Sequence, residues 1–599
     1  MKKVYKFLLM MVVISSSLFY SCETTQLEIT DNPNGLSPDK ADPDFLLNSI
    51  QVNYKNSIGR ETTTGFNNLG EQLGRIAQMN RGSDYLASLD GGTLDRPWSN
   101  FYSGMLPDIA NIEALNSPDN DLSFHLGIAK TLEAHMMMLL VDYLGDIVFS
   151  QATNPSEFPT PALDNDQDVY NAAIALLDDA KTLMENASPG SATDLFYQGD
   201  TTKWIKLINT LKMRANLTVG NYQAVVDATN VIEDTADDFE FKYGTNVLSP
   251  DNRHPDYIAD YRSDGANIYK SNWLMNLMVG DFGDFSSDTD PRRRYYFYRQ
   301  TWRTPGNYAL IRDVNGQFGD PGSVLIFNDD TGNGETLQCS IQDVPPHLQF
   351  TPDENIWCSL PLGYWGRSHM DSQGIPPDNF TRTASGVYPA GGSFDGTPDA
   401  FPFVGDFPDI QQQVALGNGG GGAGIEPIML ASYVHFMKAE ASLHLGNTAD
   451  ASTHMRAGIT TSINKVMSFG SLDPSADMSQ APDQDTVNAF IDLIMSQFDA
   501  APTSSGVDGR GYPVTKDKMD ILGEQYFVAM YGGGADAFNF IRRTGYPRTI
   551  ARSVSSDPGV FPRTILYPST EVSSNPSILQ RPDNSTKVFW DAGIINPAN

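Results

Sequence analysis

The chain has 599 residues, of which 40 are Lys or Arg and 73 are Asp or Glu, so its formal net charge is −33. Apolar residues make up 40% of the chain and aromatic residues 11%, which is enough to bury a large core. The excess of acid repels phosphate backbones, and the basic runs are as short as residues 292–294 and 542–543, so nucleic-acid binding is excluded.

The first 21 residues have the pattern of a signal peptide. Lys2, Lys3 and Lys6 form a basic start, and residues 7–14 are an unbroken apolar run. Such a run is too short to cross a bilayer of about 30 Å as a helix, so we expect the segment to be cleaved. No second run of about 18 apolar residues follows, so no membrane-spanning helix is predicted.

Cys22 stands directly after the small residue Ser21, where cleavage is expected. This arrangement resembles a bacterial lipobox, in which the cysteine is lipidated and becomes the mature N-terminus, although Phe19 and Tyr20 are bulkier than the strict pattern. Two or three acyl chains would anchor the protein stably, whereas a single chain binds a membrane only marginally. The alternative is a secreted protein in which Cys22 is incidental.

The two remaining cysteines are Cys339 and Cys358. An exported protein reaches a compartment that permits disulfides. A bond between these cysteines would close a loop of about 20 residues and contribute ~3 kcal/mol. The alternative is a pair of buried thiols. Neither cysteine has a second one at CxxC spacing, so the zinc and redox motifs of that type are absent from the sequence.

Helical periodicity dominates the chain on both sides of a long central stretch. After a polar segment broken by prolines, a helix is expected to begin near Asp44. Apolar residues recur at three- and four-residue steps in several longer segments, and Gly446 ends one of them as a C-cap. These segments are residues 126–145, 168–186, 202–218, 427–445 and 448–467.

The helices follow one another as hairpins over residues 126–186, 202–234 and 427–467. Each hairpin has an apolar face that it cannot bury alone, so neighbouring hairpins must stack. Their size is near that of tetratricopeptide units of about 34 residues, but the repeat is degenerate and periodicity alone does not identify it. The expected fold class is therefore mainly α, with stacked helical hairpins.

Residues 236–426 differ from both flanking regions. They are rich in Gly, Pro, Asp, Asn and aromatic residues, and apolar runs such as residues 324–327 indicate only short strands. The glycine-dense stretch 417–424 lacks the strand and helix that flank a phosphate-binding loop, so it is interpreted as a flexible connector.

These patterns divide the chain into regions with distinct expected roles. The regions are a signal peptide over residues 1–21, a lipid-anchored tether over 22–44, an N-terminal helical-hairpin region over 45–235, an irregular and ligand-facing insertion over 236–426, and a C-terminal helical-hairpin region with an extended tail over 427–599.

Five stretches of the chain carry a family resemblance. They are LVDYLGDIVFS at 140–150, GDTTKWIKLINTLKMR at 199–214, PIMLASYVHFMKAEA at 427–441, AFNFIRRTGYP at 537–547 and PRTILYP at 562–568. Together they resemble the SusD/RagB family of outer-membrane nutrient-binding lipoproteins, and the matches run in the family's order from residue 22 to about residue 580. The Arg-Arg-Thr-Gly-Tyr-Pro sequence at residues 542–547 is the most specific match, whereas Val148 and Phe149 stand where the family usually has Pro and Tyr.

The resemblance implies one continuous SusD-like domain over residues 22–599, with tetratricopeptide-like helical hairpins and a long loop-rich insertion that contains short strands. It implies a lipoprotein of the outer membrane that faces the exterior and acts as a hinged lid on a SusC-like TonB-dependent barrel. The trapped ligand would be an oligosaccharide or, in some members, a peptide. No enzyme activity and no cofactor are expected. The alternatives are a surface glycoside hydrolase and a structural partner of the barrel that does not touch ligand.

Sugar rings stack their C–H faces on aromatic side chains, and their hydroxyls bond to arginines, amides and carboxylates. We therefore look for ligand contacts where aromatic and polar residues share an irregular segment. In the family, the loop around a Trp-x-x-x-Tyr element, here Trp98 to Tyr102, often contributes to the ligand face. For each aromatic the alternative is packing in the core. The resulting candidates are Arg81, Trp98, Asn100, Tyr296, Trp302, Tyr364 and Trp365.

Metal binding is only weakly indicated. The loop with Asp329, Asp330 and Asn333 places oxygen ligands near glycines, as calcium loops do. It fails the EF-hand rule, because Ser340 stands where the bidentate glutamate belongs. A solvated turn is the alternative, and no metal site is predicted.

The histidines and the motif search give no catalytic centre. His435, His444 and His454 are nine and ten residues apart, so a single helical stripe does not bring them together. The sequence has no HExxH and no GxSxG motif. Arg542 and Arg543 are interpreted as structural, holding the C-terminal segment through carboxylate and carbonyl bonds.

Overall fold

A computed structural model describes most of the chain from residue 41 onward. Residues 43–599 form one compact unit, and residues 1–42 are assigned to another. The described residues are 41–60, 65–79, 84–190, 192–279, 289–300, 364, 366–370, 382–398, 413–508, 512–553, 555 and 557–596.

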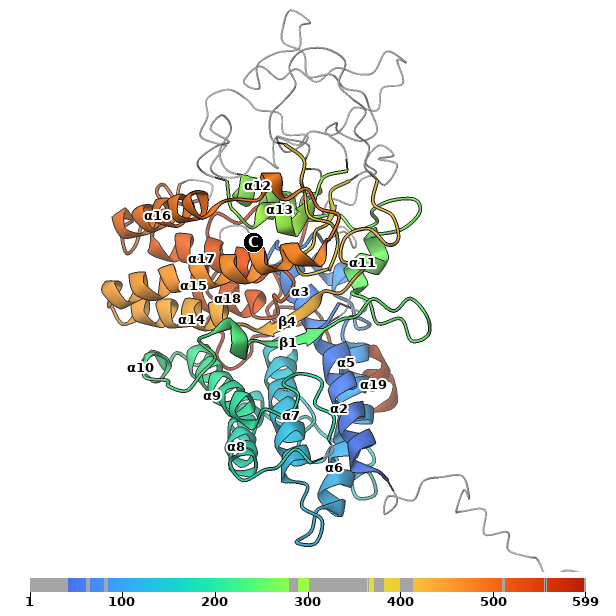
Figure 1. Ribbon diagram of the computed structural model, residues 1–599. Helices are drawn as coiled ribbons and strands as arrows, with labels where there is room; N and C mark the ends of the chain where they lie inside the picture. Colours follow the sequence, from blue (N-terminus) through green and yellow to red (C-terminus); the bar gives the residue numbers. More distant parts are fainter. Residues whose placement is uncertain are drawn as a thin grey trace, which may run out of the picture. The chain divides into compact units, whose positions relative to one another are not determined.

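The N-terminal part of the described chain is built of helices, among them the expected helix at Asp44 (Figure 1). The longest ones correspond to the predicted segments within a few residues. The helices are α2 Pro43–Ile58, α3 Phe66–Leu73, α4 Tyr85–Ser88, α5 Asp95–Ser99, the π-helix η2 Asn100–Met105, α6 Leu106–Leu115, α7 Ser123–Leu144, α8 Asp166–Glu185, α9 Thr201–Thr218 and α10 Tyr222–Val226.

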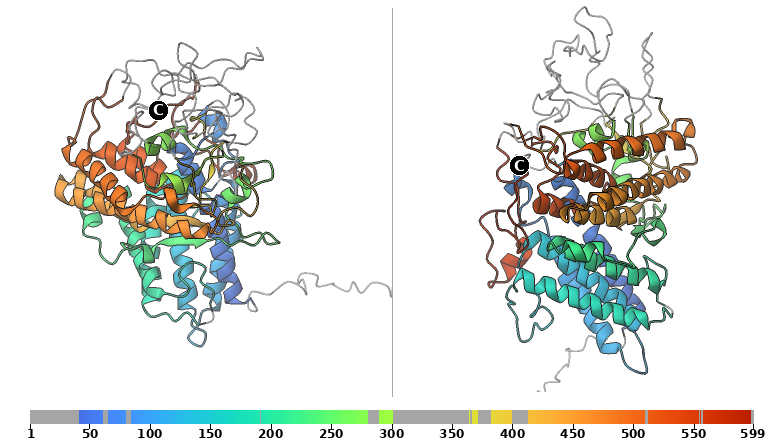
Figure 2. Two further views of the ribbon diagram at one scale, coloured as in Figure 1. Left: turned by 45° about the horizontal axis from the view of Figure 1, so that its top comes forward. Right: turned by 90° about the vertical axis from the view of Figure 1, so that its left-hand side faces the viewer.

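The C-terminal part is a second set of helices that lies beside the first across the short strands β1 and β4 (Figures 1 and 2). Helices α14 and α15 form a hairpin, as α7 and α8 do in the first set. The fold class, mainly α with tetratricopeptide-like hairpins, is confirmed. The helices of this part are α14 Ala431–His444, α15 Thr448–Ser468, α16 Gln484–Ala500, α17 Lys518–Ala529, α18 Ala537–Thr544 and α19 Ser569–Ser574.

Local sequence explains where these helices begin and end. The side chain of Asn165 accepts from the backbone N–H groups that open α8, and Asp200 does the same for α9. Asp517 and Asp520 form a reciprocal capping box at the start of α17. Gly545 ends α18 with a left-handed φ of 75°, which a residue without Cβ adopts at little cost.

The described part of the insertion contains short elements that pair over long sequence separations. Strand β1 pairs antiparallel with β4, and β2 pairs antiparallel with β3. The elements are β1 Phe239–Lys242, α11 Pro255–Asp260, α12 Asn272–Val279, α13 Arg293–Tyr296, β2 Phe297–Tyr298, β3 Ala384–Ser385 and β4 Ile425–Met429.

The predicted helix over residues 427–445 is wrong at its start. Residues 427–429 belong to β4, and the helix begins only at Ala431. Leu430 is extended, and the carboxylate of Asp238 accepts from the Ala431 N–H at 2.7 Å. Pairing with β1 and this cap from a distant residue override the local apolar pattern.

The glycine-dense stretch 417–424, interpreted above as a flexible connector, is tightly packed. Backbone N–H groups of Gly420 and Gly422 donate to carbonyls of Gly392 and Gly391, both at 3.0 Å. A Cβ on Gly419 would lie 2.1 Å from the Gly392 carbonyl oxygen. The glycines are therefore required by close backbone approach rather than by flexibility.

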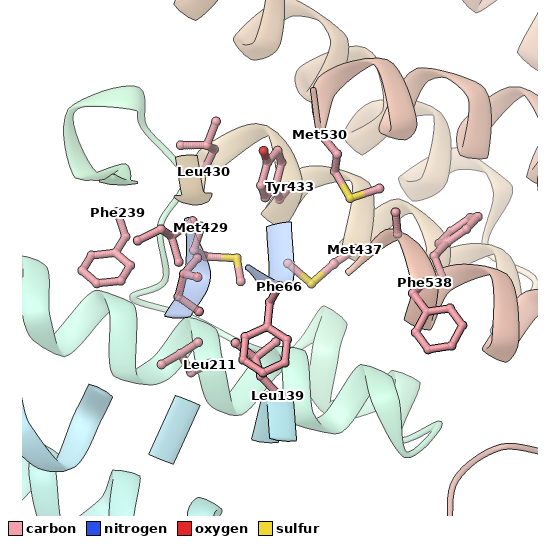
Figure 3. Packing of buried hydrophobic residues seen from close by; sticks show 14 of the residues in the cluster. Phe66, Leu139, Leu211, Phe239, Met429, Leu430, Tyr433, Met437, Met530 and Phe538 are labelled. Atoms are coloured by element: carbon pink, nitrogen blue, oxygen red, sulfur yellow. The ribbon is translucent and has the colours of Figure 1, made fainter. Parts of the chain in front are cut away.

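One hydrophobic core joins the two sets of helices. Figure 3 shows Phe66 of α3, Leu139 of α7 and Leu211 of α9 near Met437 of α14 and Phe538 of α18. All five side chains are buried. Burial of large apolar side chains is worth about 1.5–3 kcal/mol each, so this junction is a major part of the stability.

A buried polar network crosses the same junction. Asp142 of α7 accepts from Arg214 of α9 at 2.7 Å, from Asn539 of α18 at 2.8 Å and from the indole of Trp590 at 3.0 Å. Arg214 also donates to Asp536 at 2.9 Å. The network satisfies a fully buried carboxylate, as a buried charge requires.

Arg542 and Arg543 are structural, as predicted. Arg543 donates to both carboxylate oxygens of Glu440, one of them at 3.1 Å. Arg542 donates to the carbonyls of Asp142, at 2.7 Å, and of Arg563. These bonds tie α18 to α7, to α14 and to the C-terminal segment.

Candidate functional site

The described edge of the insertion is held in place by backbone pairing. The N–H of Arg367 donates to the carbonyl of Lys270 at 2.9 Å, and the N–H of Asn272 donates to the carbonyl of Arg367 at 3.0 Å. On the other side, the N–H of Met370 donates to the carbonyl of Met79 at 2.8 Å. Segments that are far apart in sequence are thereby fixed as one frame.

Two arginines lie against one tyrosine on this frame. The guanidinium carbons of Arg367 and Arg382 are 4.1 and 3.8 Å from the centre of the Tyr269 ring. Arg382 also donates to the backbone carbonyl of Asn267 at 3.2 Å. We call Asn267, Tyr269, Arg367 and Arg382 the Tyr269 cluster. Tyr269 and Arg367 are half-buried, and Asn267 is exposed.

A buried ion pair supports the cluster from beneath. Lys270 donates to Asp260 at 3.1 Å and to the hydroxyl of Ser385 at 2.6 Å. The N–H of Ser385 donates to the same carboxylate at 2.8 Å. Gln300 donates to the carbonyl of Arg382 at 2.6 Å. These bonds fix Lys270, which follows Tyr269, and the backbone of Arg382.

Behind the frame lies a buried chain of polar groups. Arg75 donates to the hydroxyl of Tyr85 at 2.8 Å, and that hydroxyl is 3.1 Å from Nε2 of His369. Burial, helped by the charge of Arg75, holds the pKa of His369 well below its usual value. Burial likewise raises the pKa of Tyr85. Both groups are therefore neutral at pH 7 and serve packing rather than proton transfer.

The Tyr269 cluster has the chemistry of a recognition site. Guanidinium groups donate several N–H bonds in a fixed plane, which suits hydroxyl, carbonyl and carboxylate oxygens. The ring of Tyr269 lies against both guanidinium groups, so the cluster presents hydrogen-bond donors that an aromatic ring holds in place. In this part of the chain, the cluster brings an aromatic ring, two guanidinium groups and an exposed amide together.

The structure buries three of the sequence-predicted ligand residues. Trp98 is 4% exposed, with its indole N–H 3.3 Å from Glu571. Tyr296 is fully buried, stacks on Tyr388 and Tyr531, and donates its hydroxyl to a backbone carbonyl at 2.9 Å. Their ring faces are covered by protein, which is the packing alternative.

Tyr364 is fully buried, and its ring lies 4.9 Å from the guanidinium of Arg299. Asn100 is partly exposed and donates to the hydroxyl of Ser57 at 3.1 Å. Neither residue belongs to the Tyr269 cluster. The other predicted site residues lie outside the described residues. These are Cys22, Arg81, Trp302, Asp329, Asp330, Asn333, Cys339, Cys358 and Trp365.

Sequence reasoning did not single out Asn267, Tyr269 and Arg382. Tyr269 stands between Ile268 and Lys270 without an aromatic neighbour, whereas candidates such as Tyr296 and Tyr364 have one next to them in sequence. Its partners Arg367 and Arg382 are about a hundred residues further along the chain. The pairing becomes visible only through the backbone contacts of the 270–272 segment.

A separate groove of about 310 Å³ lies among α6, α7 and α8. Its wall is largely apolar, with Leu106, Ile109 and Phe149 beside the carboxyl group of Glu133. Burial raises the pKa of Glu133 to about 7, an effect that Lys130 opposes.

The described part of the chain contains neither a membrane-spanning helix nor a group of three metal ligands. No helix there is both long and apolar enough to cross a bilayer. No group of three or more His, Cys, Asp or Glu side chains in that part of the chain has an arrangement that would hold a metal ion.

Comparison with solved structures identifies the fold. A SusD/RagB family protein from Bacteroides thetaiotaomicron superposes with a TM-score of 0.59 at 17% identity, covering 92% of this chain and 100% of the other. A SusD-like protein from the same organism gives 0.57 at 19% identity, with 92% and 99% covered. A chitin-binding SusD homologue from Flavobacterium johnsoniae gives 0.52 at 16% identity, with 92% and 100% covered. No curated protein matches the chain.

Sequence models of the same family match both halves of the chain. The model described as "Starch-binding associating with outer membrane" matches residues 33–321, and the one described as "Susd and RagB outer membrane lipoprotein" matches residues 426–591. The chain belongs to the SusD/RagB family of outer-membrane lipoproteins. Its members are binding proteins rather than enzymes, so the glycoside hydrolase alternative is set aside.

Proposed function

We propose that this protein captures an oligosaccharide nutrient at the cell surface and delivers it to a SusC-like TonB-dependent barrel. The family match on both halves of the chain carries this proposal, since it covers the helical hairpins and the C-terminal segment in their expected order. The chitin-binding relative of similar fold supports a glycan as ligand. Cys22 would carry the lipid, and the mature chain would face the exterior.

We place the ligand contacts in this proposal at the Tyr269 cluster and the insertion around it. Arg367 and the amide of Asn267 would bond to sugar hydroxyls, while Tyr269, whose ring is covered by the two guanidinium groups, would hold the arginines in place. The negative charge of the whole chain favours a neutral glycan over a polyanion.

Calorimetric titration of residues 23–599 with starch, chitin and mannan oligosaccharides, and with peptides, tests the proposal. We expect binding to one glycan class, weakened at least about tenfold by Tyr269→Ala or Arg367→Ala, a loss of about 1.4 kcal/mol or more. Tyr222→Ala is the control, because Tyr222 is also half-buried but stacks on His444 at 4.1 Å. Binding of a peptide alone would favour the peptide-capturing alternative.

Delivery requires a partner, so the native protein is purified from outer membranes. A co-purifying TonB-dependent barrel with bound glycan is the expected result. A barrel that takes up glycan at full rate beside a protein with Tyr269→Ala and Arg367→Ala would favour a purely structural role.

The anchor is tested separately by Cys22→Ala. We expect this variant in the soluble fraction with unchanged ligand affinity, because the lipid alone would tie the chain to the membrane. Retention in the membrane after a high-salt wash would contradict the anchor.

A further inference from the structure

The hairpin of α14 and α15 brings two histidines together. His435 lies on α14 and His454 on α15, and a connection of three residues turns the second helix back along the first. Their rings are 5.5 Å apart at an interplanar angle of 30°. The two histidines are nineteen residues apart, so they do not share one face of a single helix. They meet because the chain turns back between α14 and α15.

The facing atoms are the two Nδ1 nitrogens, which are 3.3 Å apart. A tetrahedral zinc ion binds imidazole nitrogen at about 2.0–2.1 Å, and two such bonds at the tetrahedral angle place the nitrogens about 3.3 Å from each other. The pair therefore already has the separation that a shared metal ion requires.

The protonation state also suits a ligand role. Burial lowers the pKa of both His435 and His454, so both rings are neutral at pH 7 and keep a lone pair. A hydrogen bond between the His435 ring and the backbone of Glu233 raises the pKa of the ring, as expected when a ring N–H is the donor. In metal-bound histidines such a bond orients the ring and leaves the other nitrogen to the metal.

The charges around the pair are mixed. Lys438 acts on both rings, but its ammonium group pairs with the carboxylate of Glu233. Asp450, one turn before His454 on α15, adds a negative charge. Both rings are half-buried, so solvent reaches them and water can complete the coordination shell.

We propose that His435 and His454 form a two-histidine site for a borderline-soft divalent transition ion, with Zn²⁺ as the probe, that bridges α14 and α15. The remaining coordination positions are taken by water, since the described residues offer no third ligand in place. Imidazole selects zinc, copper and nickel over magnesium and calcium. The site is independent of the proposed glycan function.

The test is titration of the mature chain, from Cys22 onward in detergent, with Zn²⁺ in a chelator-free buffer. We expect one ion per chain at this site, and an affinity lowered at least about tenfold in His435→Gln and in His454→Gln. Co²⁺ should give a visible absorption band in the native chain that is lost in the double variant. Mg²⁺ should not compete.

His444→Gln is the matched control. His444 also lies on α14, but it is exposed and stacks on Tyr222 rather than on another histidine. We expect unchanged Zn²⁺ affinity and an unchanged Co²⁺ spectrum in this variant.

Two outcomes overturn the proposal. One is the absence of Zn²⁺ binding to the native chain, which needs no variant to fold. The other is binding that the double variant leaves unaltered, because the ion then sits elsewhere. A rise in melting temperature with Zn²⁺ in the native chain but not in His435→Gln gives an independent supporting readout.

Discussion

At the residue scale, the carboxylate of Asp142 links three separate parts of the chain. It is fully buried and accepts from Arg214, Asn539 and Trp590, which come from α9, α18 and the C-terminal segment. Removing the Asp142 carboxylate leaves the buried Arg214 guanidinium with one carboxylate fewer, and it leaves the side-chain donors of Asn539 and Trp590 without this acceptor. The cost is the desolvation of all these groups rather than the loss of one bond.

Asp142→Ala should therefore lower the free energy of unfolding by about 3–5 kcal/mol. Asp178→Ala removes the exposed partner of Lys212 and should cost no more than about 1 kcal/mol. Urea unfolding followed by tryptophan fluorescence measures both. Equal small losses in the two variants would contradict the role assigned to Asp142.

Glu133 gives a pH dependence with a definite sign. Its pKa is raised to about 7 by burial, whereas an unfolded chain releases this proton near its ordinary value of about 4.5. Between these values the folded state holds the proton that the unfolded state has lost. The contribution of Glu133 to stability is complete below about pH 4.5 and is lost as the pH rises to about 7.

Comparison with Glu133→Gln isolates this effect. From pH 4.5 to 7 the native protein should lose stability relative to the variant, by up to about 1.4 kcal/mol per pH unit. The difference should be constant above pH 8. Asp179→Asn, which removes an exposed carboxylate from the same groove, is the control. Parallel curves for native protein and Glu133→Gln would refute the assignment.

At the element scale, the helical hairpins pack closely because glycines stand at their contacts. A Cβ on Gly458 of α15 would lie 3.1 Å from ring atoms of Phe436 on α14. A Cβ on Gly127 of α7 would lie 2.8 Å from Met184 of α8. In both hairpins a large side chain of one helix thus packs directly against a glycine of the other helix.

Gly458→Val should push α15 away from α14 and cost about 1–3 kcal/mol despite the better helix propensity of valine. The same variant should weaken Zn²⁺ binding at His435 and His454, since His454 lies one turn from Gly458. Ala449→Val, at an exposed position in the first turn of α15, should change stability by less than about 0.7 kcal/mol. Thermal unfolding and Zn²⁺ titration measure both effects.

The long helices could be predicted from sequence, because their apolar periodicity and caps are local properties. The prediction failed where a distant residue decides the local structure. Asp238, almost two hundred residues away, accepts a hydrogen bond from the Ala431 N–H at the start of the helix. Residues 427–429 therefore belong to a strand, and Leu430 is extended rather than helical. The glycines of 417–424 likewise are required because the backbone at residues 391 and 392 lies against them. No local sequence pattern indicates this contact.

At the scale of the whole molecule, the C-terminal segment closes the fold. Trp590 donates to Asp142 at 3.0 Å, Asp591 accepts from Arg563 at 3.1 Å, and Asn596 donates to carbonyls of Gly545 and Pro547 at 2.9 and 3.0 Å. These bonds fasten the last described residues to α7 and to the end of α18.

Deletion of residues 590–599 should lower the unfolding free energy by about 3 kcal/mol or more, at about 1 kcal/mol for each of these attachments. Calorimetric melting compares it with a chain that lacks only residues 597–599. Equal melting temperatures for the shorter deletion and the longer one would show that the segment is a passive tail.

Less of the site than of the fold could be predicted. The aromatic residues predicted to bind ligand stand near polar residues in sequence, yet Trp98, Tyr296 and Tyr364 are buried in the core. Large rings are the best core fillers as well as the best sugar platforms, so composition cannot separate the two uses. Tyr269 gains its arginines only through long-range pairing, and His435 meets His454 only through the hairpin.

The Asp142 network also sets the order in which this chain can fold. Ribosomes release the N-terminal hairpins first, but the carboxylate of Asp142 on α7 lacks two of its three partners, Asn539 and Trp590, until residues 539–590 have emerged. The early hairpins therefore cannot reach their final stability while synthesis is in progress. On the export route proposed for this protein, a chain that cannot complete its core before its C-terminal end is available would stay unfolded enough to cross a secretion channel, and it would reach its native state on the far side.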